Sequence, residues 1–519
     1  MRELVLECAK HFPGLKVWVA GGWVRDRLLS IPSADLDLAL SNVTGRHFGK
    51  FLENFTSKPE IGAKYRQKAQ TLGLPDARFT RFHIVEKNVK KAKKLETAGG
   101  KLFGLEVDLV NLRKEVYDGY SRTPEMEFGT PEEDTFRRDA TVNSLLFDLE
   151  KQEVVDLTRR GLEDLDARVM RTPLDPHQTF MDDPLRILRL VRIGSRLGFS
   201  IDVKAISCMR ERRIQQALNT MVTRERINVE VFKMMRDKDP AVAFQHLYEA
   251  DLYTPIFIRL DSPLLHELYK SCVPGQTTSQ YWPATWPRAY HFLSYLLKDG
   301  TNLGKLVQCE ANPDYLWTMV AYAPFSDLRR NLLTQAVEEA TSSLRAPAKL
   351  PKLLENTLTN FDYICEIVDV IASHDEGRPH PRSSVGMEIR SWGSTWTTQV
   401  LYVILAQSMS VQRSPTLSGN ALENIQINDL LEDPLLKRFS IFADFVSDNN
   451  LWNAHLQRPL LDGNEIQSLF GLRKGGKFLK RALDGLVTWQ FDHSNTDVDE
   501  AKVWLLGQRE IFGVPQASG

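Results

Sequence analysis

The strongest constraint on the fold is a change in the apolar pattern near residue 160. Before it, short runs of β-type residues separated by Gly-, Pro- and charge-rich turns occupy 16–20, 34–39, 102–110 and 144–149. Beyond it, apolar residues recur at helical spacing, as in 184–197 and 223–235. The sequence therefore predicts an α+β chain: an N-terminal mixed α/β head with a central sheet, followed by an all-α remainder.

Charge and cysteine content narrow the function classes. The 519 residues include 66 basic and 67 acidic side chains, a net charge of -1, so a nucleic-acid partner must be met by local basic faces. Five scattered cysteines without a Cys-x-x-Cys pair disfavour a disulfide framework and a structural zinc site. No apolar run reaches the roughly 18 residues of a membrane helix, and residues 1–12 resemble neither a secretory signal nor a transit peptide. We expect an intracellular protein without a membrane partner.

Two adjacent glycines stand between a predicted strand and a predicted helix. The run 17–20 leads into Gly21 and Gly22, and the residues from Trp23 onward have helical character. Glycines at such a junction let a phosphate approach the backbone, and the N–H groups of a helix start favour an anion. Arg25, in the first turn, can add a fixed positive charge. Alone, a Gly-Gly before a helix is usually only a turn.

Carboxylates follow on the next predicted strands. Asp35 and Asp37 are two residues apart, so both side chains leave the same face of a strand. Asp108 lies on a further strand, where Glu106 shares its face. Carboxylates placed side by side repel one another unless a cation lies between them, and hard oxygen ligands suit Mg²⁺. A lone Asp-x-Asp is more often a solvated strand face, but its order after the glycines and Arg25 favours a phosphoryl-transfer site with two metal ions.

Gly-Gly-Trp-Val-Arg-Asp followed by Asp-Leu-Asp resembles the signature of class II CCA-adding enzymes, within the polymerase-β-like nucleotidyltransferase superfamily. The resemblance implies that Asp35 and Asp37 hold Mg²⁺ and that Asp108 helps to activate the 3′-hydroxyl of tRNA. It also implies that Gly21, Gly22 and Arg25 contribute to binding the triphosphate of CTP or ATP.

A second motif, Arg-Arg-Asp-Ala-Thr-Val-Asn, ends at residue 143. Arg138 can pair with a triphosphate, while Asp139 and Asn143 offer an acceptor and an amide to a ribose. The alternative is a helix start with Arg–Asp pairs at the surface. The motif is similar to the one with which the family contacts the incoming nucleotide.

A third motif opens a predicted helix at Pro184, with Asp183 as its N-cap. Asp183 and Arg186 are three residues apart and can meet on one face, where an acceptor and a planar donor match the edge of a base. Arg189 and Arg192 continue this face. The alternative is a solvated arginine stripe. The segment resembles the family motif in which an Asp–Arg pair selects cytosine or adenine and the next arginines help to bind nucleotide.

A fourth segment, 471–481, is rich in glycine and basic residues and can bind phosphates. It is similar to the family's tail, which holds the tRNA elbow. The alternative is a basic surface helix without a partner. The candidate RNA-binding residues are Arg473, Lys474, Lys477, Lys480 and Arg481.

The resemblance divides the chain into a catalytic head (1–157), a helical neck with the nucleotide-selecting helix (158–240), a helical body (241–412) and a tRNA-binding tail (413–519). It implies stepwise, template-independent addition of C, C and A to tRNA by a monomer, with Mg²⁺, CTP and ATP. A CC-adding or A-adding enzyme, a poly(A) polymerase and a non-catalytic RNA-binding relative are the alternatives. We expect the protein in cytoplasm and nucleus, and an upstream start could add a mitochondrial form.

Overall fold

The computed structural model describes residues 1–75, 77–85, 97–116, 125–259, 261–265, 283, 285–310, 312–328, 332–344, 349–373, 382–410, 433–472, 474–493 and 497–515. These residues divide into two compact units, Met1–Met234 and Met235–Gly519. The break lies close to the predicted end of the neck at residue 240. The finer division into head, neck, body and tail remains a prediction. Arg473 lies outside the described residues.

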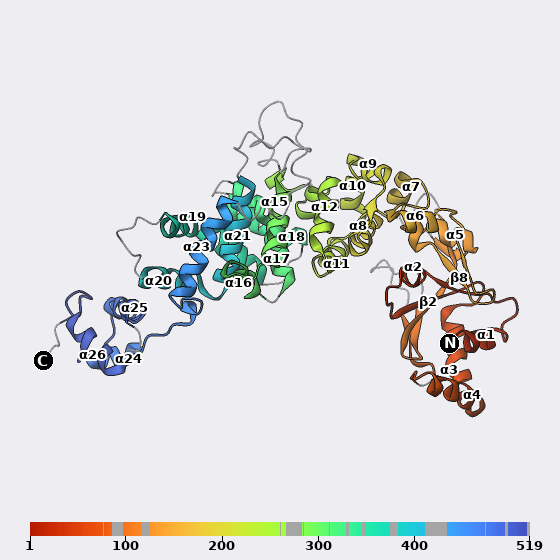
Figure 1. Ribbon diagram of the computed structural model, residues 1–519, viewed down its shortest axis with the longest axis horizontal. Coiled ribbons are helices and arrows are strands. Elements are labelled where there is room, and N and C mark those ends of the chain that lie inside the picture. The colour runs from red at the N-terminus through yellow and green to blue at the C-terminus, as the bar shows by residue number, and fades with distance from the viewer. Residues whose placement is uncertain are drawn as a thin grey trace. The chain divides into compact units, whose positions relative to one another are not determined.

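The first unit is built on a seven-stranded mixed sheet in the order β3-β4-β5-β2-β1-β8-β9. Two of its strands, β2 and β8, are labelled in Figure 1. Only β2 and β5 among the paired strands of this sheet run parallel. The strands are β1 (Val17–Ala20), β2 (Asp35–Leu40), β3 (Thr80–Val85), β4 (Thr97–Leu102), β5 (Leu105–Asn111), β8 (Leu146–Asp148) and β9 (Glu153–Val155). The predicted central sheet is therefore confirmed.

One predicted strand is wrong in its extent. Residues 102–110 form the end of β4 and most of β5, which pair antiparallel with Leu102 opposite Leu105. The chain reverses at Phe103 and Gly104, both at positive φ (53° and 82°). Because the turn contains no polar residue, the apolar pattern continues through it and hides it.

Helices cover the sheet and hold its connections. α3 (Gly45–Ser57) packs on β3, β4 and β5, while α2 (Gly22–Leu28) follows β1 directly. A hairpin of β6 (Arg113–Val116) and β7 (Glu125–Phe128) leads into α5 (Pro131–Phe136). This helix begins with a capping box at Thr130. The other elements up to residue 170 are α1 (Arg2–Ala9), α4 (Pro59–Thr71), η2 (Thr141–Asn143), α6 (Gly161–Ala167) and β10 (Val169–Met170).

Short helices follow the sheet within the first unit. α8 (Leu185–Leu197) buries Ile187, Leu190 and Val191, as its apolar spacing predicts. It ends at Gly198 in the left-handed conformation (φ 66°). Its neighbours are α7 (Pro176–Asp182), β11 (Ser200–Ile201), α9 (Val203–Met209), α10 (Arg212–Met221) and α11 (Arg224–Met235).

The described part of the second unit is helical, as predicted. Its interior around Trp286 brings together Phe244, Tyr253, Phe257 and Tyr290. Its helices up to residue 410 are α12 (Pro240–Glu249), α13 (Tyr253–Phe257), α15 (Trp286–Leu296), α16 (Asn302–Gln308), α17 (Pro313–Tyr322), η3 (Ala323–Asp327), α18 (Leu333–Leu344), α19 (Lys349–Ala372), α20 (Arg382–Trp392), η5 (Gly393–Thr395) and α21 (Trp396–Ser410).

The last helices, α24 (Gly463–Leu469), α25 (Lys477–Asp492) and α26 (Val498–Gly507), form an apolar cluster around Phe470, Phe478 and Leu486. Before them, α23 (Pro434–Asp448) packs on α19 and α16, and η7 (Ala454–Leu456) packs on α20. Throughout the described residues, we find no helix with the length and apolar character needed to cross a membrane.

Candidate active site

A row of in-register residues crosses the sheet and brings the predicted carboxylates together. Asp37 on β2 lies opposite Asp108 on β5, and Asp35 lies opposite Glu106. Direct partners on neighbouring strands present their side chains on the same face. Four carboxylates from two strands that are distant in the sequence therefore share one surface. Asp35 and Asp108 are exposed there, while Asp37 is half-buried.

The electrostatics of Asp37 reflect this crowding. Burial raises the pKa of the Asp37 carboxyl, Arg138 acts against this, and Asp108 and Asp35 raise it further. A site that crowds negative charge to this extent is suited to a cation.

The donor set fits Mg²⁺ on its chemistry. In the described residues, no three His, Cys, Asp or Glu side chains gather closely enough to form a ready-made metal group. Mg²⁺ commonly takes only one or two protein carboxylates and completes its shell with water and substrate phosphates. Asp35 and Asp37 satisfy that requirement.

At Gly21 the backbone comes close to the side chains of Asp37 and Arg138. It has φ 73° and ψ -146°, a backbone conformation that side chains disfavour. A Cβ added there would lie 3.1 Å from Asp37 Oδ2 and 3.3 Å from Arg138 Nη1. The backbone before α2 therefore lies directly against a carboxylate and a guanidinium, and its binding of a phosphate stays a prediction.

Asp134 sets the orientation of Arg138. Its Oδ2 accepts from Arg138 Nη2 at 2.8 Å and from Nε at 3.2 Å, while Oδ1 accepts from Arg137 Nε at 3.0 Å. Asp134 is 1% exposed. Burial raises the pKa of its carboxyl, but Arg138 and Arg137 outweigh this and hold the pKa below its ordinary value. Our sequence analysis did not single out Asp134, although its i,i+4 spacing to Arg138 was a usable signal.

Arg25, Asn143 and Asp139 form a buried chain of hydrogen bonds. Arg25 donates to Asn143 Oδ1 and, through Nη2 at 2.6 Å, to Asp26 Oδ1. Asn143 Nδ2 donates to Asp139 Oδ1 at 3.0 Å. Arg25 is 4% exposed. Its guanidinium is thus engaged within the protein, although we predicted it at the triphosphate.

Asp139 ties this chain to α8. Its Oδ2 accepts from Arg189 Nε at 2.8 Å, across 50 residues of sequence. Burial would raise the pKa of Asp139, but Arg189 and the hydrogen bond from Asn143 outweigh it and lower the pKa to about 2. Both oxygens of Asp139 are engaged with neighbours, so a contact with ribose would be additional to these bonds.

The start of α8 differs by one residue from the prediction. Asp183 is the C-cap of α7 and Pro184 the N-cap of α8, yet Asp183 Oδ1 still accepts from the Leu185 N–H at 3.1 Å. Arg186 is buried, and its Nη1 donates to the Thr179 carbonyl at 3.2 Å. The structure brings Asp183 and Arg186 to the same helix junction.

Two side chains of α11 contact the start and the end of the segment 183–192, through Asp183 and Arg192. Glu230, 5% exposed, accepts from Arg192 Nε at 2.6 Å. Arg226 lies 3.6 Å from Asp183 Oδ2. Both α11 side chains therefore point to the segment 183–192, a contact between distant segments that spacing within one helix could not reveal.

The predicted RNA-binding residues of the tail that the structure describes are exposed. Lys474 precedes α25, and Lys477, Lys480 and Arg481 lie in its first two turns. Backbone glycines at 475 and 476 lead into this helix start. The combination gives anion-attracting N–H groups beside basic side chains.

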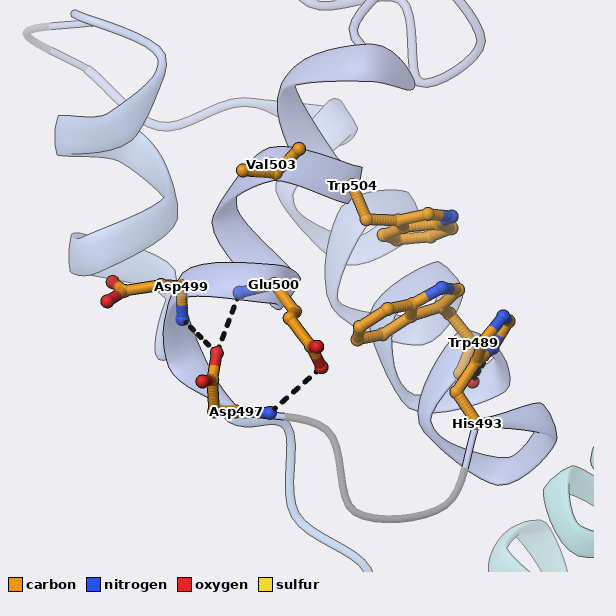
Figure 2. Close-up of a pocket in the computed structure, with 7 residues that line it drawn as sticks. All are labelled: Trp489, His493, Asp497, Asp499, Glu500, Val503 and Trp504. Carbon is orange, nitrogen blue, oxygen red and sulfur yellow. Dashed lines mark hydrogen bonds between the residues drawn. The ribbon is translucent and has the colours of Figure 1, made fainter.

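A pocket lined by the C-terminal end of α25 and the start of α26 carries acidic side chains instead of basic ones. Figure 2 shows Trp489 stacked with His493 and Trp504, at ring-centroid distances of 4.9 and 5.4 Å. Asp497 and Glu500 form a capping box at the start of α26 beside these rings, next to Asp499 (Figure 2). Because carboxylates repel phosphates, the start of α25 is the better candidate for RNA.

The chain is similar to known proteins along most of its length. Residues 17–171 match the family model described as the poly A polymerase head domain. The chain is similar to "Nucleotidyltransferase lcsQ" of Purpureocillium lilacinum, with 33% identity covering 96% of this chain and 87% of the relative. It is 32% identical to the "CCA tRNA nucleotidyltransferase, mitochondrial" of Saccharomyces cerevisiae, covering 92% of this chain and 85% of that protein.

The fold is also that of a solved CCA-adding enzyme in complex with CTP. The TM-score is 0.61 at 17% identity, with 99% of this chain and 94% of the other covered. The similarity thus extends from the sheet through the helical second unit. Together with relatives more than 30% identical along most of its length, it shows that the chain belongs to the CCA tRNA nucleotidyltransferase family.

Proposed function

We propose that this nucleotidyltransferase adds C, C and A stepwise to the 3′ end of tRNA, from CTP and ATP, without a nucleic-acid template. The observation that carries the proposal is the row of carboxylates on β2 and β5 beside Gly21 and Arg138. A relative named CCA tRNA nucleotidyltransferase and a solved CCA-adding enzyme that carries CTP support it.

In the proposed reaction, the 3′-oxygen of tRNA forms a bond with the α-phosphorus of the nucleotide, and the bond to pyrophosphate breaks. Asp108 accepts the proton of the attacking hydroxyl. Arg138 and the backbone at Gly21 and Gly22 hold the triphosphate by charge and by close approach. Asp35 and Asp37 would hold Mg²⁺, which when bound supplies charge stabilisation to the phosphates.

The remaining residues act on position and choice. Asp183 and Arg186 select the base, with Arg189 and Arg192 in support. A chain of hydrogen bonds connects α2, beside the proposed triphosphate site, to α8 through Arg25, Asn143 and Asp139. Lys474, Lys477, Lys480 and Arg481 bind the tRNA elbow, and we extend this role to Arg473. We further propose a monomer acting in cytoplasm and nucleus, while a relative is named as mitochondrial.

The test uses purified protein, Mg²⁺ and tRNAs that lack CCA, CA or only the final A. Each tRNA receives CTP alone, ATP alone or both, and the products are resolved at single-nucleotide length. We expect growth by CCA that then stops. Addition of only CC, or of only A to a CC end, would limit the function to one half of the reaction, and long A tails would indicate a poly(A) polymerase. No extension by wild type would contradict the proposal.

A further inference from the structure

His83 lies in the same cross-strand row as the candidate catalytic carboxylates. On β3 it is the direct partner of Gly99 on β4, Gly99 is the partner of Asp108 on β5, and Asp108 is the partner of Asp37. Side chains of direct partners share one face of the sheet. The edge strand therefore adds an imidazole to the surface that carries the carboxylates, and our sequence analysis did not single it out.

Gly99 allows this imidazole and Asp108 to approach each other. Strands two apart in a sheet are separated by roughly 10 Å, which normally keeps their side chains from meeting. A Cβ built at Gly99 would lie 2.7 Å from Asp108 Oδ1 and 3.2 Å from His83 Nε2. Both side chains thus lean over the same glycine from opposite sides, and the space above it is within reach of both.

The ring of His83 is oriented so that its Nε2 faces the space above Gly99. Its Nδ1 lies 3.1 Å from the carbonyl oxygen of Arg81. Because a carbonyl only accepts, Nδ1 carries the proton of this bond, and in that tautomer Nε2 is the acceptor. The carbonyl is placed by a local irregularity: the β3–β4 register shifts between Thr80 and His83, and Arg81 has φ 55°. Such bulges redirect side chains.

We propose that His83 Nε2 accepts a hydrogen bond from the 2′-hydroxyl of the terminal tRNA nucleotide. The inference rests on the proposed function, in which Asp108 receives the 3′-hydroxyl of that nucleotide. The 2′- and 3′-hydroxyls of a ribose are on adjacent carbons and on the same side of the ring. An acceptor beside the group that meets the 3′-oxygen is therefore placed to meet the 2′-hydroxyl, the group that distinguishes RNA from DNA. His83 is then a specificity-determining residue for a ribose end.

The experiment compares two tRNAs that end in CC, one with a normal terminal ribose and one lacking only the terminal 2′-hydroxyl. Incorporation of A is measured as kcat/KM for wild type and for His83→Ala. Wild type should favour the ribose end by roughly two- to tenfold, the effect of one hydrogen bond. In His83→Ala this ratio should fall to about one, because only the reaction of the ribose end slows.

His47→Ala is the matched control, since His47 is another exposed histidine of the same unit, on α3. It should retain the wild-type ratio, and melting curves should show that both variants are folded. The inference is overturned if the ratio of kcat/KM for the two tRNAs is the same in His83→Ala as in wild type. If both values of kcat/KM also fall equally, His83 acts only through Asp108. Failure of wild type to extend the ribose end would instead contradict the proposed function.

Discussion

At the scale of single residues, the crowded carboxylates of the candidate active site carry unfavourable negative charge, which the proposed cation would neutralise. Asp37 is the clearest case, because its pKa is raised by burial and by two neighbouring carboxylates, against the effect of Arg138. A carboxyl with a raised pKa in the folded state costs stability at pH values above that pKa, and the cost disappears as the group takes up a proton. In the proposed function, Asp37 thus serves activity at the expense of stability.

Asp37→Asn should therefore change activity and stability in opposite directions. We expect nucleotide addition to fall roughly a thousandfold or more, because a metal site is worth several kcal/mol to a transition state. Without metal, the melting temperature should rise relative to wild type at pH 7, and this gain should shrink near pH 4. Calorimetry with and without Mg²⁺ checks this, since Mg²⁺ should stabilise wild type more than the variant. A variant less stable than wild type at pH 7 would contradict this account.

At the scale of elements, the sequence was most informative where chemistry and periodicity coincide. The two-residue spacing of Asp35 and Asp37 is sufficient to place both on one face, and the structure agrees. The apolar turn at Phe103 and Gly104 and the polar edge strand β3 carry no such signal. Pairings between distant segments were out of reach for the same reason: nothing local in the sequence indicates that Asp139 meets Arg189, or that His83 faces Asp108.

The bond between Asp139 and Arg189 gives an element-scale prediction, because it joins α8 to the segment before η2. Arg189→Ala should leave a buried carboxylate with one partner fewer. We expect a loss of about 1–2 kcal/mol in the unfolding of the first unit, allowing for solvent screening at the half-exposed Arg189. Asp139 has a lowered pKa, so its contribution is present above pH 4 and is lost as the pH falls toward about 2.

Unfolding of wild type and Arg189→Ala at several pH values measures this contribution. The difference between them should be constant from about pH 7 to 5 and should decline below pH 4. Arg196→Ala is the matched control, since Arg196 is an exposed arginine in the last turn of the same helix. A difference that does not depend on pH would show that Arg189 contributes by packing alone.

At the scale of the whole molecule, the candidate chemistry and the candidate RNA surface belong to different compact units. The proposed catalytic and nucleotide-selecting residues all lie within Met1–Met234, and the basic start of α25 lies within Met235–Gly519. Substrate selection can then be divided: the first unit recognises the nucleotide and the 3′ end, while the second recognises a distant part of the tRNA. The two contributions should be separable by mutation.

Replacing Lys477, Lys480 and Arg481 together by alanine should weaken tRNA binding without impairing chemistry. Each phosphate contact that is lost lowers the dependence of binding on salt, so the slope of log K against log salt should decrease by about two to three. KM for tRNA should rise while kcat changes little. A minihelix that carries the acceptor end but lacks the elbow should be extended equally by wild type and variant.

The control is the double variant Lys349→Ala with Lys352→Ala, which removes two exposed lysines of α19 and should change neither the slope nor KM. An equal defect on the minihelix would move the role of these residues from the elbow to the 3′ end.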